Sequence, residues 1–101
     1  MIPIFEFETE LWPWTAENGI SWFFLSVPED ESDQIEEMTP DLGGFGSVKV
    51  QVTVGETTWN TSLFPSTEKE CYILPIKKPV RKAEGIEEGD KVKVELEVLI
   101  G

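Results

Sequence analysis

Three stretches of the chain alternate strictly between inward and outward side chains, and this pattern restricts the fold more than any other feature. The clearest stretch is 92–98, V-K-V-E-L-E-V, and similar alternation occupies 5–11 and 48–54. Because successive side chains of a strand point to opposite faces, each stretch predicts a strand with one buried face. The predicted inward side chains are Phe5, Phe7, Thr9 and Leu11, then Val48, Val50, Val52 and Val54, then Val92, Val94, Leu96 and Val98.

A further strand is predicted at 20–27, directly after the first. The dipeptide Asn18-Gly19 favours a two-residue type I′ hairpin turn, since both central positions of that turn need positive φ. The strand that follows has apolar side chains on both faces, with Trp22 and Phe24 on one and the alternate residues on the other. We therefore expect this strand to be covered on both sides.

A second hairpin is predicted around Gly55-Glu56, which suits a two-residue type II′ turn. The strand after it would then place Trp59 and Leu63 on the same face as the valines of 48–54. The glycines of 43–46 precede a strand, whereas a phosphate-binding loop opens a helix. We interpret them as turn residues.

Two short helices complete the predicted elements. The first follows Pro28, carries acidic residues in its first turn, and has Ile35 and Met38 as its apolar contacts. In the second, Pro79 suits the first helical position and Gly85 the residue after the end. Ile86 could then fold back on the helix, as often accompanies a left-handed glycine cap.

Charge and residue usage exclude several classes of function. The chain has 101 residues, a formal net charge of −12, one cysteine and no histidine. The negative charge argues against broad phosphate binding, because nucleic-acid affinity comes largely from Lys and Arg. Without histidine, the usual general base and the commonest metal ligand are missing. We expect a non-catalytic protein with no metal or cofactor.

The same features bear on compartment and domain organisation. Cys71 cannot form an internal disulfide and has no histidine to activate it, so we expect a structural role for it. The N-terminus lacks the basic start and apolar run of a signal peptide, and no apolar stretch is long enough to span a bilayer. These observations predict one domain over 1–101, a cytoplasmic location and no membrane contact.

Half of all Lys and Arg residues lie within six positions, and this basic cluster is the candidate ligand site. It comprises Lys77, Lys78, Arg81 and Lys82. One interpretation is a site for an anion or an acidic partner, completed by Thr61, Ser62 and Tyr72. The other is structural: Arg81 and Lys82 complement the dipole at the C-terminus of the helix, while the lysines pair with nearby acids. The structural interpretation needs no ligand and is preferred.

Four tryptophans raise a second possibility. Trp12, Trp14, Trp22 and Trp59 could form a platform on which a base or a peptide stacks. Aromatic residues at strand spacing more often belong to the core, but Trp12 and Trp14 come just before a turn, where partial exposure is expected.

Several ordered motifs resemble a known family. They are F-G-S-V-K-V-Q-V-T-V-G at 45–55, W-N-T-S-L-F-P at 59–65, Y-I-L-P-I-K-K-P-V-R-K-A-E-G-I at 72–86 and G-D-K-V-K-V at 89–94. Together they resemble the domain of unknown function 1905 of bacteria and archaea. The resemblance implies an all-β fold, a small closed six-stranded barrel of the double-split type with one or two short helices. It implies no activity.

The C-terminal third also resembles the half-motif of AbrB-like swapped-hairpin proteins, many of which bind DNA. The chain is about twice the length of such a half, so a monomer is expected, with a dimer as the alternative. Two functions are therefore carried forward. The first is an accessory domain that binds an unknown protein partner. The alternative is a module that binds anions or nucleic acid through residues 77–82, although the net charge makes nucleic acid the weaker form.

Overall fold

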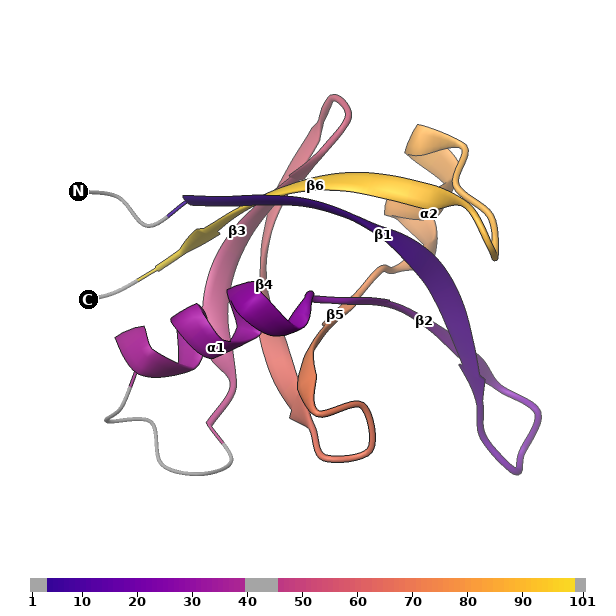
Figure 1. Ribbon diagram of the computed structural model, residues 1–101. Helices are drawn as coiled ribbons and strands as arrows, with labels where there is room; N and C mark the ends of the chain where they lie inside the picture. The colour runs from indigo at the N-terminus through magenta and orange to yellow at the C-terminus, as the bar shows by residue number, and fades with distance from the viewer. Residues whose placement is uncertain (1–3, 40–45, 100–101) are drawn as a thin grey trace.

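A computed structural model describes residues 4–39 and 46–99, and its strands close into a barrel with a short helix on either side (Figure 1). The strand order around the barrel is β1-β2-β5-β4-β3-β6, and every neighbouring pair is antiparallel. The elements are β1 (Ile4–Thr15), β2 (Ser21–Ser26), α1 (Glu29–Met38), β3 (Val48–Val54), β4 (Thr57–Ser66), β5 (Cys71–Pro75), α2 (Lys78–Glu84) and β6 (Lys91–Val98). The predicted six-stranded all-β barrel with short helices is confirmed.

The predicted alternation determines which side chains fill the barrel. On β3 and β6 every second residue is buried, beginning with Val48 and Val92, while the residues between them face outward. On β1, Leu11 is buried, and Phe5 and Phe7 are partly buried against the same core. A small barrel of this kind is filled by its own side chains, and apolar burial is its main source of stability.

The hairpin between β1 and β2 differs from the prediction. Ala16 and Ile20 are joined by a backbone hydrogen bond of 2.9 Å, so the loop holds residues 17–19 rather than two residues. Gly19 has φ of 86°, but Asn18 does not have positive φ. Instead, the Asn18 side-chain oxygen accepts the Ile20 N–H at 3.1 Å, an Asx-type contact that stabilises the wider turn. The predicted type I′ turn is therefore wrong.

The hairpin between β3 and β4 agrees with the prediction. Val54 lies opposite Thr57, which leaves Gly55 and Glu56 as a two-residue turn, and Gly55 has φ of 59°. Trp59 lies opposite Val52, on the face of the valines. The glycine-rich stretch 43–46 lies mostly outside the described residues, so its interpretation as a turn stays a prediction.

Helix α1 is held against the barrel by two side chains of different kinds. Ile35 is fully buried in the core, as expected of its apolar contact. Ser32 is also buried, and its hydroxyl donates to the Val27 carbonyl at 3.0 Å while accepting the Tyr72 N–H at 3.1 Å. The polar anchor was not predicted, because a serine in an acidic helix has no distinguishing sequence pattern.

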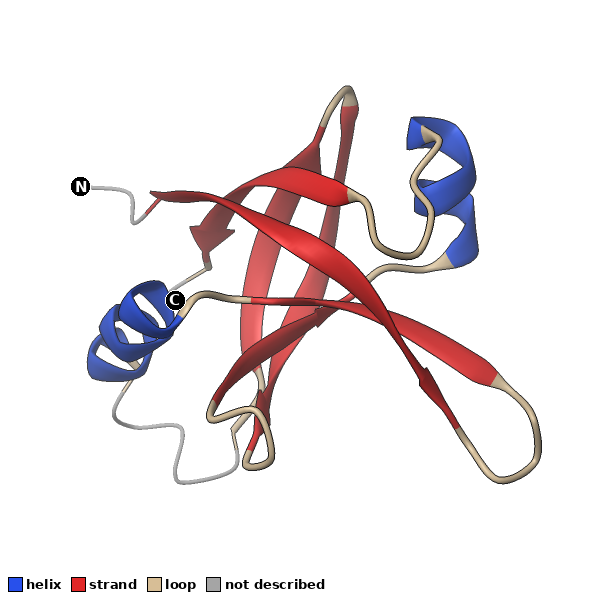
Figure 2. Ribbon diagram, turned by 45° about the vertical axis from the view of Figure 1, so that its right-hand side comes forward, coloured by secondary structure: helices blue, strands red, loops and turns tan. Residues whose placement is uncertain are grey.

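Helix α2 lies on the other side of the barrel from α1 (Figures 1 and 2). Val80 is its buried residue, and Gly85 ends the helix in the left-handed conformation, with φ of 63° and ψ of 36°. Ile86 is half-buried and packs against the core that includes Val80. Pro79 is the second residue of the helix rather than the first, a difference within the usual uncertainty of helix ends.

Candidate binding surface

The basic cluster predicted from the sequence lies on and just before α2. Lys77, Lys78 and Lys82 are exposed, whereas Arg81 is half-buried. The guanidinium carbon of Arg81 lies 4.1 Å from the centroid of the Phe23 ring, and its Nε donates to the Ile76 carbonyl at 3.2 Å. Arg81 is therefore engaged in holding α2 against β2, and its Nε contacts a carbonyl that precedes the helix rather than one at its C-terminal end.

The two hydroxyls proposed to complete that cluster lie on opposite faces of β4. Thr61 is opposite Val50, whose side chain is fully buried inside the barrel. Ser62 is opposite Lys49, which is exposed on the outside. Because successive strand residues alternate in direction, Thr61 and Ser62 cannot line one surface.

Tyr72 lies at a third place. It is opposite Pro65, near the end of β4, and shares the inward face of β5 with Leu74. Helix α2 meets the other end of β4, where the Thr57 hydroxyl donates to the Glu84 carboxylate at 2.5 Å. Tyr72 packs against the buried core, whereas Lys77, Lys78 and Lys82 are exposed. The structure therefore does not bring Tyr72 to the basic cluster.

The most distinctive surface is aromatic and lies on the outside of the β1–β2 hairpin. Trp12 is opposite Phe24 and Trp14 is opposite Trp22, so these four side chains share one outward face, here named the outer aromatic face. Trp14 is 51% exposed and Trp22 is 52% exposed. The fourth tryptophan, Trp59, belongs to the inward face of β4 and is separate from this surface.

The exposure of Trp22 corrects the expectation that its strand is covered on both sides. Figure 2 shows why: the far end of the β1–β2 hairpin extends beyond the barrel, away from both helices. Side chains near the tip therefore have no described element packed over them, even though the sequence pattern is that of a strand buried on both sides.

Trp12 is the ordered centre of the outer aromatic face. Its ring centroid lies 5.1 Å from that of Phe24 at an interplanar angle of 35°, within the range of favourable aromatic pairs. Its indole Nε1 donates to the Ser26 hydroxyl at 2.9 Å. The Lys69 ammonium lies 4.8 Å from the Trp12 ring centroid, which is a cation–π contact. One aromatic ring of this face is thus already occupied by a cation.

Apolar side chains continue this surface across the neighbouring strands. Pro75 of β5 lies opposite Phe24, and Ile73 lies opposite both Ser26 and Phe64. Phe64 is 45% exposed. The outer aromatic face is therefore the start of an apolar strip that crosses β1, β2, β5 and β4.

Cys71 lies at the margin of this strip. Burial raises the pKa of its thiol, and a hydrogen bond with Ser26 and the charge of Lys69 lower that pKa only in part. A thiol with a raised pKa carries little thiolate near neutral pH and is a poor nucleophile. This agrees with the structural role expected for Cys71.

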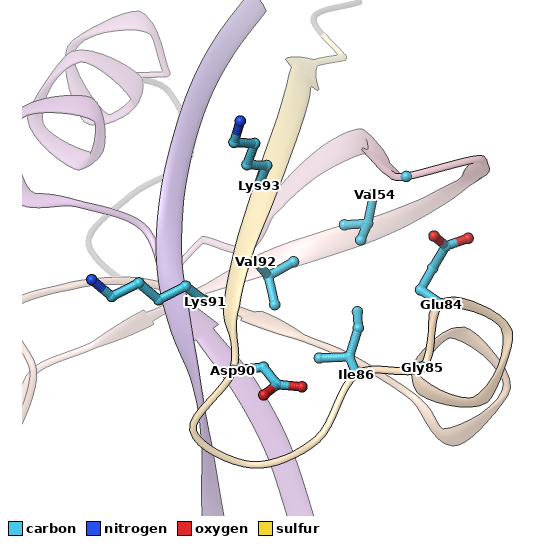
Figure 3. A pocket seen from close by; sticks show the side chains of 9 residues that line it. Val54, Glu84, Gly85, Ile86, Asp90, Lys91, Val92 and Lys93 are labelled. Carbon is cyan, nitrogen blue, oxygen red and sulfur yellow. The ribbon is translucent and has the colours of Figure 1, made fainter.

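A separate hollow of about 330 Å³ lies between the β3–β4 turn, the end of α2 and the start of β6 (Figure 3). Val54, Ile86 and Val92 form its apolar part, and the side chains of Lys91 and Lys93 extend away from these three. Its acids already have partners, since Glu84 accepts the Thr57 hydroxyl and Asp90 accepts the Glu87 N–H at 2.8 Å. The hollow therefore has few uncommitted groups with which to orient a ligand.

Within 4–39 and 46–99, no three acidic, cysteine or histidine side chains gather as a metal site would require. No helix in the same ranges is long and apolar enough to cross a membrane.

The sequence of the chain matches a known protein family. The family described as a domain of unknown function (DUF1905) matches residues 7–96. The chain belongs to the DUF1905 family. The match runs from β1 into β6 and so includes both helices and the whole apolar strip. The resemblance inferred from the four sequence motifs is confirmed, and the family description carries no activity. Among curated proteins, nothing matches the chain.

Proposed function

We propose that this DUF1905 domain is a non-catalytic protein-interaction module that binds its partner through the outer aromatic face. One observation carries the proposal: Trp14 and Trp22, paired across two strands, are each about half exposed on a surface that continues into further apolar side chains. Contiguous exposed apolar patches on small domains commonly mark interaction sites.

The residue types support a protein partner. Tryptophan is enriched at the energetic centres of protein–protein interfaces, where it supplies a large contact area with little conformational entropy to lose. Part of this face is also fixed before binding, because Trp12 is held by its contacts with Phe24 and Ser26. A surface that is ordered before binding loses less entropy when a partner docks on it.

Binding of an anion by the basic cluster is the second candidate. Its support is the exposure of Lys77, Lys78 and Lys82 around one short helix. It is the weaker candidate because Arg81 is engaged with Phe23, and because Thr61, Ser62 and Tyr72 lie elsewhere. Under this alternative, Lys78→Ala would abolish binding of the ligand, and changes to Trp22 would not.

Selection from a random peptide library tests the proposed function. The wild-type domain and a Trp14→Ser, Trp22→Ser variant would be immobilised in parallel, and the enriched sequences compared after several rounds. We expect wild type to enrich a recognisable motif and the variant to lose that enrichment, because the rings that contact the peptide are gone. Both proteins should show the same unfolding transition, since the two tryptophans lie outside the buried core.

A matched control carries two changes on another outward surface. Thr58→Ala with Asn60→Ala alters exposed residues of β4 that lie opposite β3. This variant should enrich the same motif as wild type. If the tryptophan variant enriched that motif equally well, or if wild type enriched nothing, the proposed function would be wrong.

A further inference from the structure

We infer that the outer aromatic face binds a positively charged segment of a partner protein, whose Arg or Lys side chains lie against the rings of Trp14 and Trp22. This inference rests on the proposed function and adds the chemistry of the partner.

The chain itself shows that aromatic rings of this hairpin accept cations. On the outer face, the Lys69 ammonium lies over Trp12, with 4.8 Å between nitrogen and ring centroid. On the other face, the Arg81 guanidinium lies over Phe23 at 4.1 Å. Two of the eight Lys and Arg residues thus make cation–π contacts with one hairpin. Among the described residues, neither Trp14 nor Trp22 has such a partner, and both rings remain about half exposed.

The charges around the outer aromatic face also favour a cation. Glu10 precedes Trp12 on the same face of β1, and Glu17 lies in the hairpin loop. Glu68 and Glu70 flank Lys69 in the turn between β4 and β5. The cations nearby are Lys69, Lys91, which lies opposite Glu10, and Lys77, which lies two residues beyond Pro75, the last β5 residue paired with β2. The local balance is slightly negative.

The charge of the whole chain decides between possible occupants. A second copy would bring two chains of net charge −12 together, and a nucleic acid would bring phosphates to the same negative protein. Both are opposed by long-range repulsion, whereas a basic segment is attracted and steered toward the surface. Of these three partners, only a basic segment can both make cation–π contacts with the exposed rings and be attracted by the negative net charge.

Defined peptides test the inference. Four nine-residue peptides of one design would carry four Arg, four Lys, four citrulline or four Glu residues, separated by Gly and Ser. Citrulline keeps the shape of Arg without its charge. Binding would be followed by NMR, using the indole N–H signals of the four tryptophans to locate the site. We expect the Arg and Lys peptides to shift the signals of Trp14 and Trp22, and the citrulline and Glu peptides to leave them unchanged.

Attraction of a polycation to an acidic protein is expected anywhere on its surface, so the deciding variant changes no charge. Trp14→Leu with Trp22→Leu keeps apolar side chains and removes both aromatic rings. We expect it to weaken binding of the Arg peptide by about five- to thirtyfold, the range of one to two cation–π contacts. Thr58→Ala with Asn60→Ala should leave that affinity unchanged.

Three results would overturn the inference. If the citrulline peptide bound the tryptophans as tightly as the Arg peptide, the face would be an apolar docking site, and the proposed function would stand without the basic partner. If the leucine variant bound the Arg peptide as well as wild type, the attraction would be diffuse charge alone. If wild type sedimented as a dimer that the leucine variant lost, a second copy would be the occupant.

Discussion

Two features favour glycine at position 55. Its φ of 59° is strained for any residue with a side chain, and a methyl group there would overlap Glu84 Oε1. We predict that Gly55→Ala lowers the free energy of unfolding by about 2–3 kcal/mol. Gly85 has nearly the same φ, 63°, but open space around it, so Gly85→Ala should cost less, about 1 kcal/mol. Urea unfolding of the two variants measures the difference.

The contribution of Glu84 can be separated by a double-mutant cycle. In a Glu84→Ala background the overlap is gone, so Gly55→Ala should cost less than it does in wild type. An unchanged cost would mean that backbone strain alone accounts for the requirement at Gly55.

Cys71 gives a prediction about pH. Since burial raises its pKa above the ordinary value of 9.0, the neutral thiol is favoured by folding. The sign follows: this contribution to stability is complete below the unfolded pKa and is lost as the pH rises through the higher folded pKa. We expect alkylation by iodoacetamide to have a midpoint above that of the urea-unfolded chain. Lys69→Ala should raise the midpoint further, because the Lys69 charge lowers this pKa. A midpoint equal to that of the unfolded chain would contradict the prediction.

At the scale of elements, Arg81 joins α2 to β2. Arg81 combines a cation–π contact with Phe23 and a hydrogen bond to the Ile76 carbonyl. We predict that Arg81→Ala lowers the free energy of unfolding by about 1–2 kcal/mol, whereas Lys82→Ala changes it by less than about 0.5 kcal/mol. Thermal and urea unfolding would measure both. Equal, small effects would instead favour Arg81 as a free cation of an anion site.

The strands were more predictable than the turns between them and the side-chain contacts made across the fold. Alternation in β3 and β6 specifies the buried face directly, because a shift of one residue would expose every valine. The turn at Asn18 was not predictable, since the same dipeptide suits a two-residue turn or, through its side-chain oxygen, a wider one. Ser32 was missed because its hydrogen-bond partners, Val27 and Tyr72, are brought together only by tertiary structure.

The candidate site was predicted only in part, for a related reason. Sequence spacing identified Trp22 and Phe24 as sharing one face, and that is correct. It could not show that the β1–β2 hairpin extends beyond the barrel, because strand length and barrel height are set by the closure of all six strands. Thr61 and Ser62 were wrongly grouped in one site with the basic cluster. They are adjacent in sequence, but adjacent residues of a strand point to opposite faces and cannot share one surface.

For the molecule as a whole, charge is the property with the widest consequences. Twenty acidic and eight basic residues give the net charge of −12. The β1–β6 register places opposite charges across from one another, because Glu8 lies opposite Lys93 and Glu10 opposite Lys91. The same register also sets Glu6 directly opposite Glu95. Opposite charges in such positions stabilise a sheet and like charges destabilise it, so one ladder contains both effects.

The excess of acids predicts that salt stabilises the fold. Screening weakens repulsion among the many carboxylates more than it weakens the few attractive pairs, so the free energy of unfolding should rise from 10 mM to 300 mM NaCl and then level off. Urea is the suitable denaturant because it carries no charge. Glu6→Gln should stabilise the protein at low salt and Glu8→Gln should destabilise it, and both differences should shrink as salt is added. A fall in stability with salt would show that attraction between opposite charges across the β1–β6 ladder outweighs the net charge. Stabilisation by Glu8→Gln at low salt would contradict the prediction in the other way, because the net charge would then outweigh the attraction between Glu8 and Lys93.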